Sequence, residues 1–242
     1  MLCIPPDAAL GHEMGMLNRV AAGESPFLWA LWATERALVL PWRARHHPNM
    51  VRATVSLAQL GWRCYFRHTG GGAVPQGQGI INLSLAFRLP EGGVEGAGSI
   101  AWSYNALCGM LREGLAACGV NASVGEVEGA VCNGRYNIVI DGKKFAGTAQ
   151  RRRRAQGGGE AVLVHATLWC DNAIAHSVQA VNVYNQAMAI PERAEIDSHT
   201  NLSLAVGPTN YKVAYVDFAR ALLAVLKSWR SREELRLIGA AP

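Results

Sequence analysis

The stretch that decides the fold is a short segment in the second half of the chain, Asp141-Gly142-Lys143-Lys144-Phe145-Ala146-Gly147-Thr148-Ala149-Gln150. Asp-Gly is among the strongest signals for a two-residue β-turn. A run at residues 136–140 has the composition of a strand, so the sequence predicts a hairpin that turns at Asp141 and Gly142. Successive side chains of a strand point to opposite faces, so only one of Lys143 and Lys144 can enter a pocket.

The rest of the chain mixes helical and extended patterns. Apolar residues recur at helical spacing, or near it, in residues 7–20, 51–60, 99–118 and 217–237. Extended patterns occupy residues 27–40, 62–67, 80–87 and 161–169. The order is neither a regular βαβ alternation nor all-β, so we predict an α+β fold, a sheet with flanking helices. No repeat or linker divides the sequence, and residues 1–242 are expected to form a single domain.

Composition favours a folded protein with a sizeable core, since 50% of the 242 residues are hydrophobic and 17% are charged. No apolar run approaches the roughly 20 residues that a membrane-spanning helix needs, and the start lacks the pattern of a secretory signal. The cysteines form no CxxC pair, which favours reduced thiols in the cytoplasm over disulfides or a zinc site. They are Cys3, Cys64, Cys108, Cys118, Cys132 and Cys170. We expect no metal site.

The net charge is +5, and its most uneven feature is the run Arg151-Arg152-Arg153-Arg154. Four consecutive arginines indicate a solvated loop. The functional alternative is a docking site for an acidic partner, either a nucleic acid or a carrier protein. No zinc finger, aromatic RNA-binding pair or basic helical face is present, which disfavours nucleic acid.

The second unusual stretch is Arg67-His68-Thr69-Gly70-Gly71-Gly72-Ala73-Val74, which a strand carrying Asn82 follows. Three adjacent glycines remove every Cβ from the loop, so a ligand can lie against backbone amides. The stretch is not a Walker loop, because no Gly-Lys-Ser/Thr follows, and its glycines lack Rossmann spacing. Taken alone, three glycines more often form a flexible turn than a site.

Together, the glycine-rich stretch and the lysine hairpin resemble the lipoate-protein ligase A and octanoyltransferase family, as does the strand around His165. The resemblance implies the catalytic-domain fold of biotin and lipoate protein ligases, with a larger mixed β-sheet, a small second sheet and helices outside. It gives the role of the essential lysine to Lys144. It also implies substrate contacts for Arg67, Gly70, Gly71, Gly72, Ala73, Asn82, Gly147, Thr148 and His165.

Cys132 separates two mechanisms within this family. The cysteine-using octanoyltransferases and amidotransferases carry a nucleophilic cysteine a few residues before a Tyr-Asp or Tyr-Glu strand, and this chain has Cys132 before Tyr136-Asn137. Asn137 replaces the usual acidic residue. Family ligases often carry an aromatic-His-Asp run where this chain has Pro75-Gln76-Gly77, and they usually need a C-terminal accessory domain, for which no room remains after residue 237. The resemblance therefore favours transfer over ATP-dependent ligation.

The leading hypothesis is an enzyme that transfers an octanoyl or lipoyl group to a lysine of an acidic lipoyl-domain protein through acyl-Cys132. The E2 subunits and the glycine-cleavage H protein are the expected acceptors, and acyl carrier protein is an alternative donor. This reaction needs no tightly bound cofactor. Two alternatives stay open. An ATP-dependent lipoate-protein ligase, including the large subunit of a split enzyme, would use ATP and Mg. A non-catalytic acyl- or biotin-binding regulator would bind without transfer.

Overall fold

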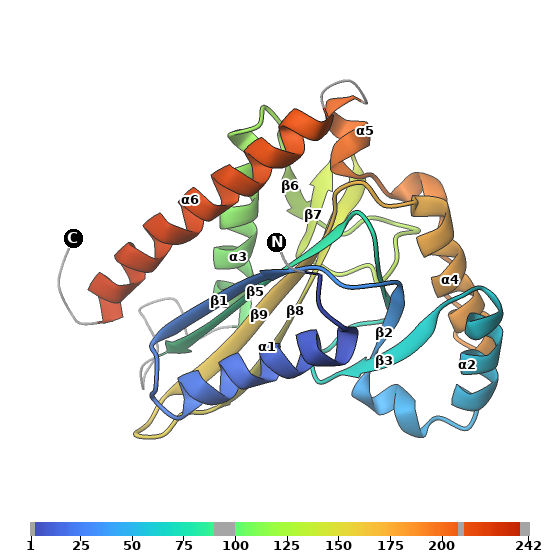
Figure 1. The fold of residues 1–242 in the computed structure, drawn as a ribbon, viewed down its shortest axis with the longest axis horizontal. Coiled ribbons are helices and arrows are strands. Elements are labelled where there is room, and N and C mark those ends of the chain that lie inside the picture. Colours follow the sequence, from blue (N-terminus) through green and yellow to red (C-terminus); the bar gives the residue numbers. More distant parts are fainter. Residues whose placement is uncertain (1–2, 90–99, 208–210, 238–242) are drawn as a thin grey trace.

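The computed structural model describes residues 3–89, 100–207 and 211–237, and a six-stranded sheet runs through its centre (Figure 1). The strand order is β1-β5-β9-β8-β7-β6, and all neighbouring strands are antiparallel. The strands are β1 (Phe27–Trp32), β5 (Ile80–Leu89), β6 (Ser123–Gly125), β7 (Asn137–Ile140), β8 (Lys143–Arg154) and β9 (Glu160–Trp169).

A three-stranded sheet lies beside it, in the order β3-β2-β4. It contains β2 (Ala37–Pro41), β3 (Arg63–Arg67) and β4 (Val74–Gln76), and β2 is parallel to β3 but antiparallel to β4. Helices α2 (Met50–Gln59) and α4 (Ile174–Ala187) pack together next to this sheet, at the right of Figure 1. The predicted α+β fold with a small second sheet is confirmed. The mixture of strand directions lies in the small sheet.

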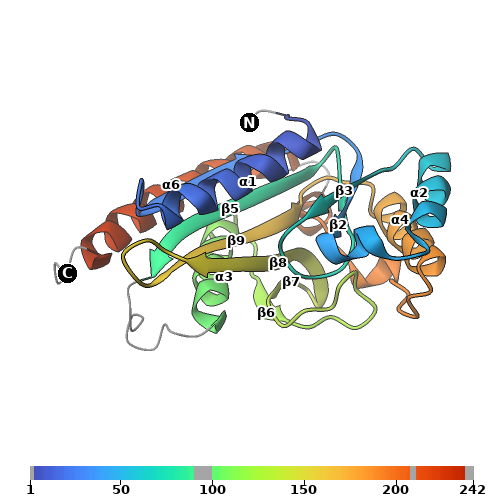
Figure 2. The ribbon, with the colours of Figure 1, turned by 90° about the horizontal axis from the view of Figure 1, so that it is seen from below.

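Helices cover both faces of the large sheet. In Figure 2, α1 (Pro6–Ala21) lies on one side of β5 and β9, and α3 (Ile100–Ala116) lies on the other. The α3 side also buries residues of α6 (Tyr211–Leu237) and the short α5 (Leu202–Val206) in the largest apolar cluster. A smaller cluster joins α1 to Ala86, Ala161 and Leu163. The protein is therefore layered, with one sheet face packed on α3 and α6 and the other on α1.

The pleat of β5 and β9 sorts apolar from polar side chains. Leu83 and Leu85 face the α3 cluster. The alternating residues Asn82 and Ser84 are also buried, and they pair in register with Thr167 and His165, respectively. Because side chains alternate along a strand, these four polar side chains share the face that α1 covers. The sequence thus places a polar group inside the fold, next to the small sheet.

Most predicted elements are confirmed to within a few residues, although residue 99 lies outside the described part of the chain. The prediction of a solvated loop at Arg151–Arg154 is wrong. β8 continues to Arg154 because its backbone stays paired with β9 as far as Glu160. Helices α4 and α5 and strands β4 and β6 were not predicted from the sequence.

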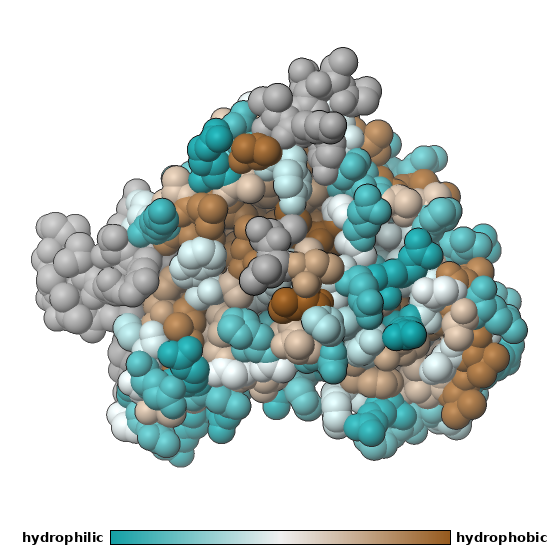
Figure 3. All heavy atoms as spheres, viewed as in Figure 1, coloured by the Kyte–Doolittle hydropathy of each residue, from teal (hydrophilic) through white to brown (hydrophobic). Residues whose placement is uncertain are grey.

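The face shown in Figure 3 is a mosaic of polar and apolar residues. Apolar atoms at its right edge lie over α2, where Val51 and Val55 are exposed. Within residues 3–89, 100–207 and 211–237, no helix combines the length and apolar character needed to cross a membrane.

Candidate active site

A cavity of about 360 Å³ opens on the sheet face that α1 covers, between the large sheet and the glycine-rich loop. It brings together nine of the residues singled out in the sequence: Arg67, Gly70, Gly71, Asn82, Cys132, Lys144, Gly147, Thr148 and His165. Gly72 and Ala73 instead line a neighbouring hollow of about 790 Å³. Gly71 and Cys132 border both spaces. The four arginines line neither of them.

Arg67 holds the glycine-rich loop in place. It is the last residue of β3 and is 5% exposed. Its guanidinium donates to the carbonyls of Val39 (3.0 Å), Gly70 (2.7 Å) and Gly72 (2.9 Å). Burial lowers the pKa of Arg67, against the attraction of Cys132 and Glu13. The side chain that the family resemblance assigns to substrate contact therefore also braces the loop that encloses the cavity.

Cys132 has an exposed thiol and an unusual backbone. Its φ of +50° lies in the left-handed region, which non-glycine residues adopt infrequently. The backbone amide of Gly72 donates a hydrogen bond to Sγ at 3.1 Å. An added Cβ at Gly72 would lie 3.4 Å from the Cys132 Cβ, so the absence of a side chain there lets the loop approach the sulfur closely. The sulfur thus stands at the border of the cavity, with a backbone donor directed at it.

Lys144 is buried, with 6% exposure, whereas Lys143 is exposed, as the alternation of side chains predicts. The Nζ of Lys144 donates to the carbonyls of Val131 and Cys132, the latter at 2.9 Å. Burial lowers the pKa of Lys144 to about 8, although the proximity of Cys132 opposes this shift. An ammonium carries three N–H donors, so one remains for a group inside the cavity.

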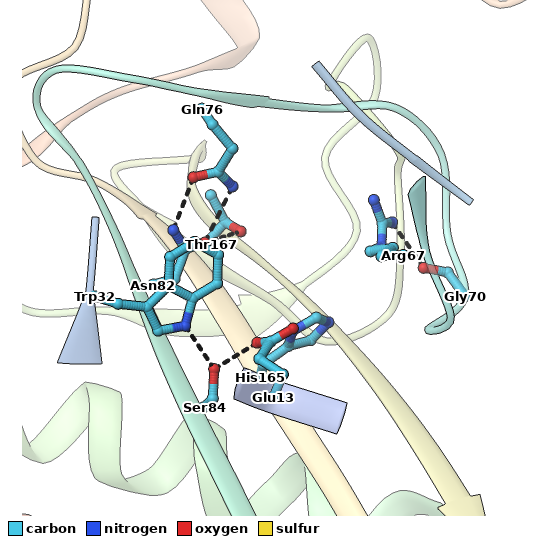
Figure 4. Close-up of polar contacts among 9 residues, drawn as sticks. All are labelled: Glu13, Trp32, Arg67, Gly70, Gln76, Asn82, Ser84, His165 and Thr167. Atoms are coloured by element: carbon cyan, nitrogen blue, oxygen red, sulfur yellow. Dashed lines mark hydrogen bonds and ion pairs between the residues drawn. The ribbon is translucent and has the colours of Figure 1, made fainter. Parts of the chain in front are cut away.

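A buried polar network surrounds Glu13 of α1 at another part of the cavity (Figure 4). Glu13 is 2% exposed and lies 2.7 Å from the Nδ1 of His165. Ser84 donates to the same carboxylate oxygen and accepts a hydrogen bond of 3.0 Å from the Trp32 ring nitrogen. Burial alone would raise the pKa of Glu13, but the contacts with His165, Ser84 and Arg67 outweigh it, and the pKa is lowered. The network therefore favours an ionised carboxylate.

A second polar group adjoins the first (Figure 4). The side-chain amides of Gln76 and Asn82 exchange two hydrogen bonds, of 3.1 and 2.7 Å, and Thr167 donates to Asn82 at 2.8 Å. All three residues line the cavity. The reciprocal pairing fixes both amides, so this wall presents a defined set of polar atoms to a ligand.

Sequence reasoning did not single out Glu13, Trp32, Gln76 or Thr167 as site residues. One signal was available for Glu13. It lies four residues after Ala9 and four before Leu17, on the face of α1 that is buried. A carboxylate on the apolar side of a helix needs a partner inside the fold. That partner, His165, is 152 residues away in the sequence.

The arginine run forms bonds within the protein. Arg151 donates to the His68 carbonyl at 2.7 Å, Arg152 pairs with Glu160 at 2.7 Å and also reaches Ser103, and Arg153 bonds Asn18. Exposed side chains remain at Arg151, Arg153 and Arg154. Their use by a partner stays a prediction.

Comparison with known proteins gives a consistent result. The model of the lipoyl protein ligase A/B catalytic domain matches residues 5–227. An octanoyl-[GcvH]:protein N-octanoyltransferase of Geobacillus kaustophilus is 36% identical over 150 residues, 62% of this chain and 50% of the relative. A lipoyl-[GcvH]:protein N-lipoyltransferase of Listeria monocytogenes is 29% identical over 137 residues, 57% and 48% of the two chains. The chain spans about half the length of these curated relatives. A lipoate-protein ligase A structure with bound ATP shares the fold, with a TM-score of 0.67 and 17% identity over 94% of this chain and 84% of the other.

Proposed function

We propose that this chain, which belongs to the lipoyl protein ligase A/B catalytic-domain family, transfers an octanoyl or lipoyl group to a lysine of a lipoyl-domain protein. The proposed intermediate is an acyl thioester on Cys132. The observation that carries the proposal is the position of the sulfur. It is exposed, borders the cavity that Lys144 enters and accepts a backbone hydrogen bond from Gly72. A nearby cation and an amide donor stabilise the negative charge on a sulfur that takes part in nucleophilic attack.

The proposed reaction has two half-reactions. The Cys132 thiolate attacks the carbonyl carbon of a thioester or acyl-lysine donor. The new carbon–sulfur bond forms, the donor bond breaks, and the leaving thiol or amine takes up a proton. The neutral amine of the acceptor lysine then attacks the acyl-cysteine. The amide forms, the amine loses a proton, and the cysteine leaves as a thiolate.

Lys144 and the loop amides support the proposed charge development. The tetrahedral intermediate places negative charge on the former carbonyl oxygen, and fixed donors that face this oxygen lower the barrier. The remaining N–H of Lys144 is suited to this task, because its other donors are already bound to the carbonyls of Val131 and Cys132. The proposed reaction needs no tightly bound cofactor.

The proposed partners include glycine-cleavage H protein, because two relatives carry GcvH in their names. The lipoyl domains of E2 subunits are proposed as further acceptors, as the family resemblance implies. Acidic partners would be attracted to the exposed arginines at the end of β8. Replacing Arg153 and Arg154 by serine should lower the association rate at low salt and leave single-turnover transfer nearly unchanged. Identical association rates and salt dependence would reject this docking site. We also propose a cytoplasmic location, since the described cysteines are free thiols.

The deciding experiment incubates the protein with octanoyl-H-protein or an octanoyl carrier and an apo lipoyl domain, without ATP. Intact-protein mass should show an octanoyl adduct on this chain and then on the acceptor. Cys132→Ser should abolish both, whereas Cys3→Ser, which changes another exposed thiol, should abolish neither. Transfer by Cys132→Ser that requires ATP and Mg would indicate a ligase. Ligand binding without transfer, tolerant of Lys144→Ala, would indicate a regulator.

A further inference from the structure

The backbone at Cys132 needs external support. The left-handed conformation costs a non-glycine residue about 1–2 kcal/mol, and Cys132 adopts it with φ of +50°. The contacts of the flanking residues therefore decide whether the sulfur stays in place. Val131 is the informative neighbour, because both its backbone N–H and its C=O are bound by side chains.

The side chain that binds the Val131 amide is His199. Its Nε2 lies 2.9 Å from the Val131 nitrogen, and its Nδ1 lies 2.8 Å from the Glu195 carbonyl oxygen. An amide can only donate and a carbonyl can only accept. Nε2 therefore accepts and Nδ1 carries the proton, so the geometry requires one neutral tautomer.

His199 is also fixed from its other sides. It is 3% exposed, and its ring stacks on Trp169 with centroids 4.8 Å apart and planes 15° apart. Burial lowers the pKa of His199 to about 4, and the nearby charge of Lys144 acts in the same direction. The neutral form that the hydrogen bonds need is thus maintained at neutral pH.

The segment that carries His199 also holds Lys144. A β-bridge pairs the two residues, and the amide of Thr200 donates to the Lys144 carbonyl at 2.9 Å. The Lys144 ammonium then binds the carbonyls of Val131 and Cys132. Lys144, residues 131–132 and residues 199–200 are therefore hydrogen-bonded to one another, and each segment fixes the other two.

We propose that His199 is a positioning residue for Cys132, and that its neutral imidazole holds the Val131 amide so that the sulfur stays beside Lys144 and the Gly72 amide. The importance of this role for turnover rests on the proposed function. The role itself concerns only the geometry of the thiol. His199 needs no contact with substrate, because it acts through the backbone of residue 131.

Two conservative variants separate the two hydrogen bonds of the ring. In His199→Gln, the side-chain oxygen reaches the position of Nε2 and can accept from the Val131 amide. In His199→Asn, the shorter amide reaches only the position of Nδ1 and can donate to Glu195. The matched control is His176→Asn, which changes an exposed histidine on α4.

The first readout is the rate at which iodoacetamide alkylates Cys132, followed by the mass of the peptide that contains it. Loss of a buried hydrogen bond corresponds to about a fivefold to tenfold change in an equilibrium. His199→Asn should therefore slow alkylation about fivefold or more, and His199→Gln should restore it to within about twofold. Backbone hydrogen exchange at residues 127–134 should accelerate in the Asn variant and return toward wild type in the Gln variant.

Equal rates in wild type, Gln and Asn would overturn the proposal, and so would equal losses in both variants while both keep the wild-type melting temperature. If a variant fails to fold, the ring-nitrogen chemical shifts of His199 in the wild-type protein give a second measurement: a proton on Nδ1 and none on Nε2 would support the proposal, and a proton on Nε2 would overturn it. Alkylation and exchange require no acyl transfer, so these outcomes are independent of the proposed reaction. If Cys132→Ser still transfers acyl groups, the proposed function fails while the positioning result stands. In the proposed enzyme, His199→Asn should lower kcat and leave the KM for the acceptor nearly unchanged.

Discussion

The replacement of Lys144 by methionine tests the charge in the candidate active site. Burial lowers the pKa of this lysine to about 8 from its ordinary 10.5. Each pKa unit corresponds to about 1.4 kcal/mol, so the full difference is about 3–4 kcal/mol. Between these two values the folded protein has released the proton while the unfolded chain still holds it. Raising the pH through this window therefore stabilises the wild-type protein, and the gain disappears as the pH falls through 8.

Lys144→Met lacks this titration. Relative to the variant, the wild-type protein should gain about 2 kcal/mol of unfolding free energy between about pH 7 and about pH 9.5. Urea unfolding at several pH values measures the difference, in which the titrations common to both proteins cancel. Lys143→Met is the control, because Lys143 is exposed, and it should follow the wild-type pH dependence. A difference between wild type and Lys144→Met that does not change with pH would refute the argument from burial. In the proposed transfer reaction, Lys144→Met should lose a factor of about 100–1000 in kcat.

Three further predictions use single variants. Gly71→Ala should slow acyl-enzyme formation about tenfold or more, because φ is +98° there and an added Cβ would lie 3.0 Å from a guanidinium nitrogen. Gly125→Ala, which has no atom within 4 Å of its added Cβ and does not line the cavity, should leave single-turnover transfer within about twofold. Glu13→Gln should lower the unfolding free energy by about 1–3 kcal/mol at neutral pH. This loss should shrink as the pH falls below 4.5 and through the lowered pKa of the folded carboxyl, which urea titrations would detect. Gly142→Ala should lower the free energy of unfolding by about 1–2 kcal/mol, because alanine must then adopt the positive φ of Gly142. Gly79→Ala should lower the melting temperature clearly more than Gly142→Ala, because its added Cβ would lie 2.3 Å from backbone atoms. Equal losses in melting temperature in the two variants would contradict this clash.

Local patterns in the sequence were enough to predict most elements of the fold. The Asp-Gly turn set the hairpin register that buries Lys144 and exposes Lys143. Helix α4 was missed although Ile174, Val178 and Val181 follow helical spacing and are buried. The helix has no acidic residue in its first turn and no basic residue in its last turn, so common signals for its boundaries were absent.

The arginine run shows where local reasoning fails. Charge suggested a loop, but the partner strand β9 extends far enough to pair the backbone through Arg154. Arg152 of β8 then forms an ion pair with Glu160 of β9. Whether a charged run forms a strand thus depends on what lies beside it, which a single segment does not reveal.

The family motifs identified nine of the residues that line the cavity, but not how they are held. Cys132 and Lys144 were recognisable from short stretches of sequence. Glu13 and His199 make their key contacts with residues 152 and 68 positions away, respectively. Contacts over such separations follow from the sheet order and the crossing of segments, which pattern recognition does not supply.

The shared border of the two hollows at Cys132 has a kinetic consequence for the proposed transfer. One thiol serves both half-reactions, so the donor protein must depart before the recipient protein can unload the acyl group. Initial velocities should then give parallel lines in double-reciprocal plots, and a surplus of recipient should inhibit by occupying the unloaded enzyme. The turnover rate of the proposed reaction would then depend on the binding and dissociation of two carrier proteins as well as on the bond-making steps.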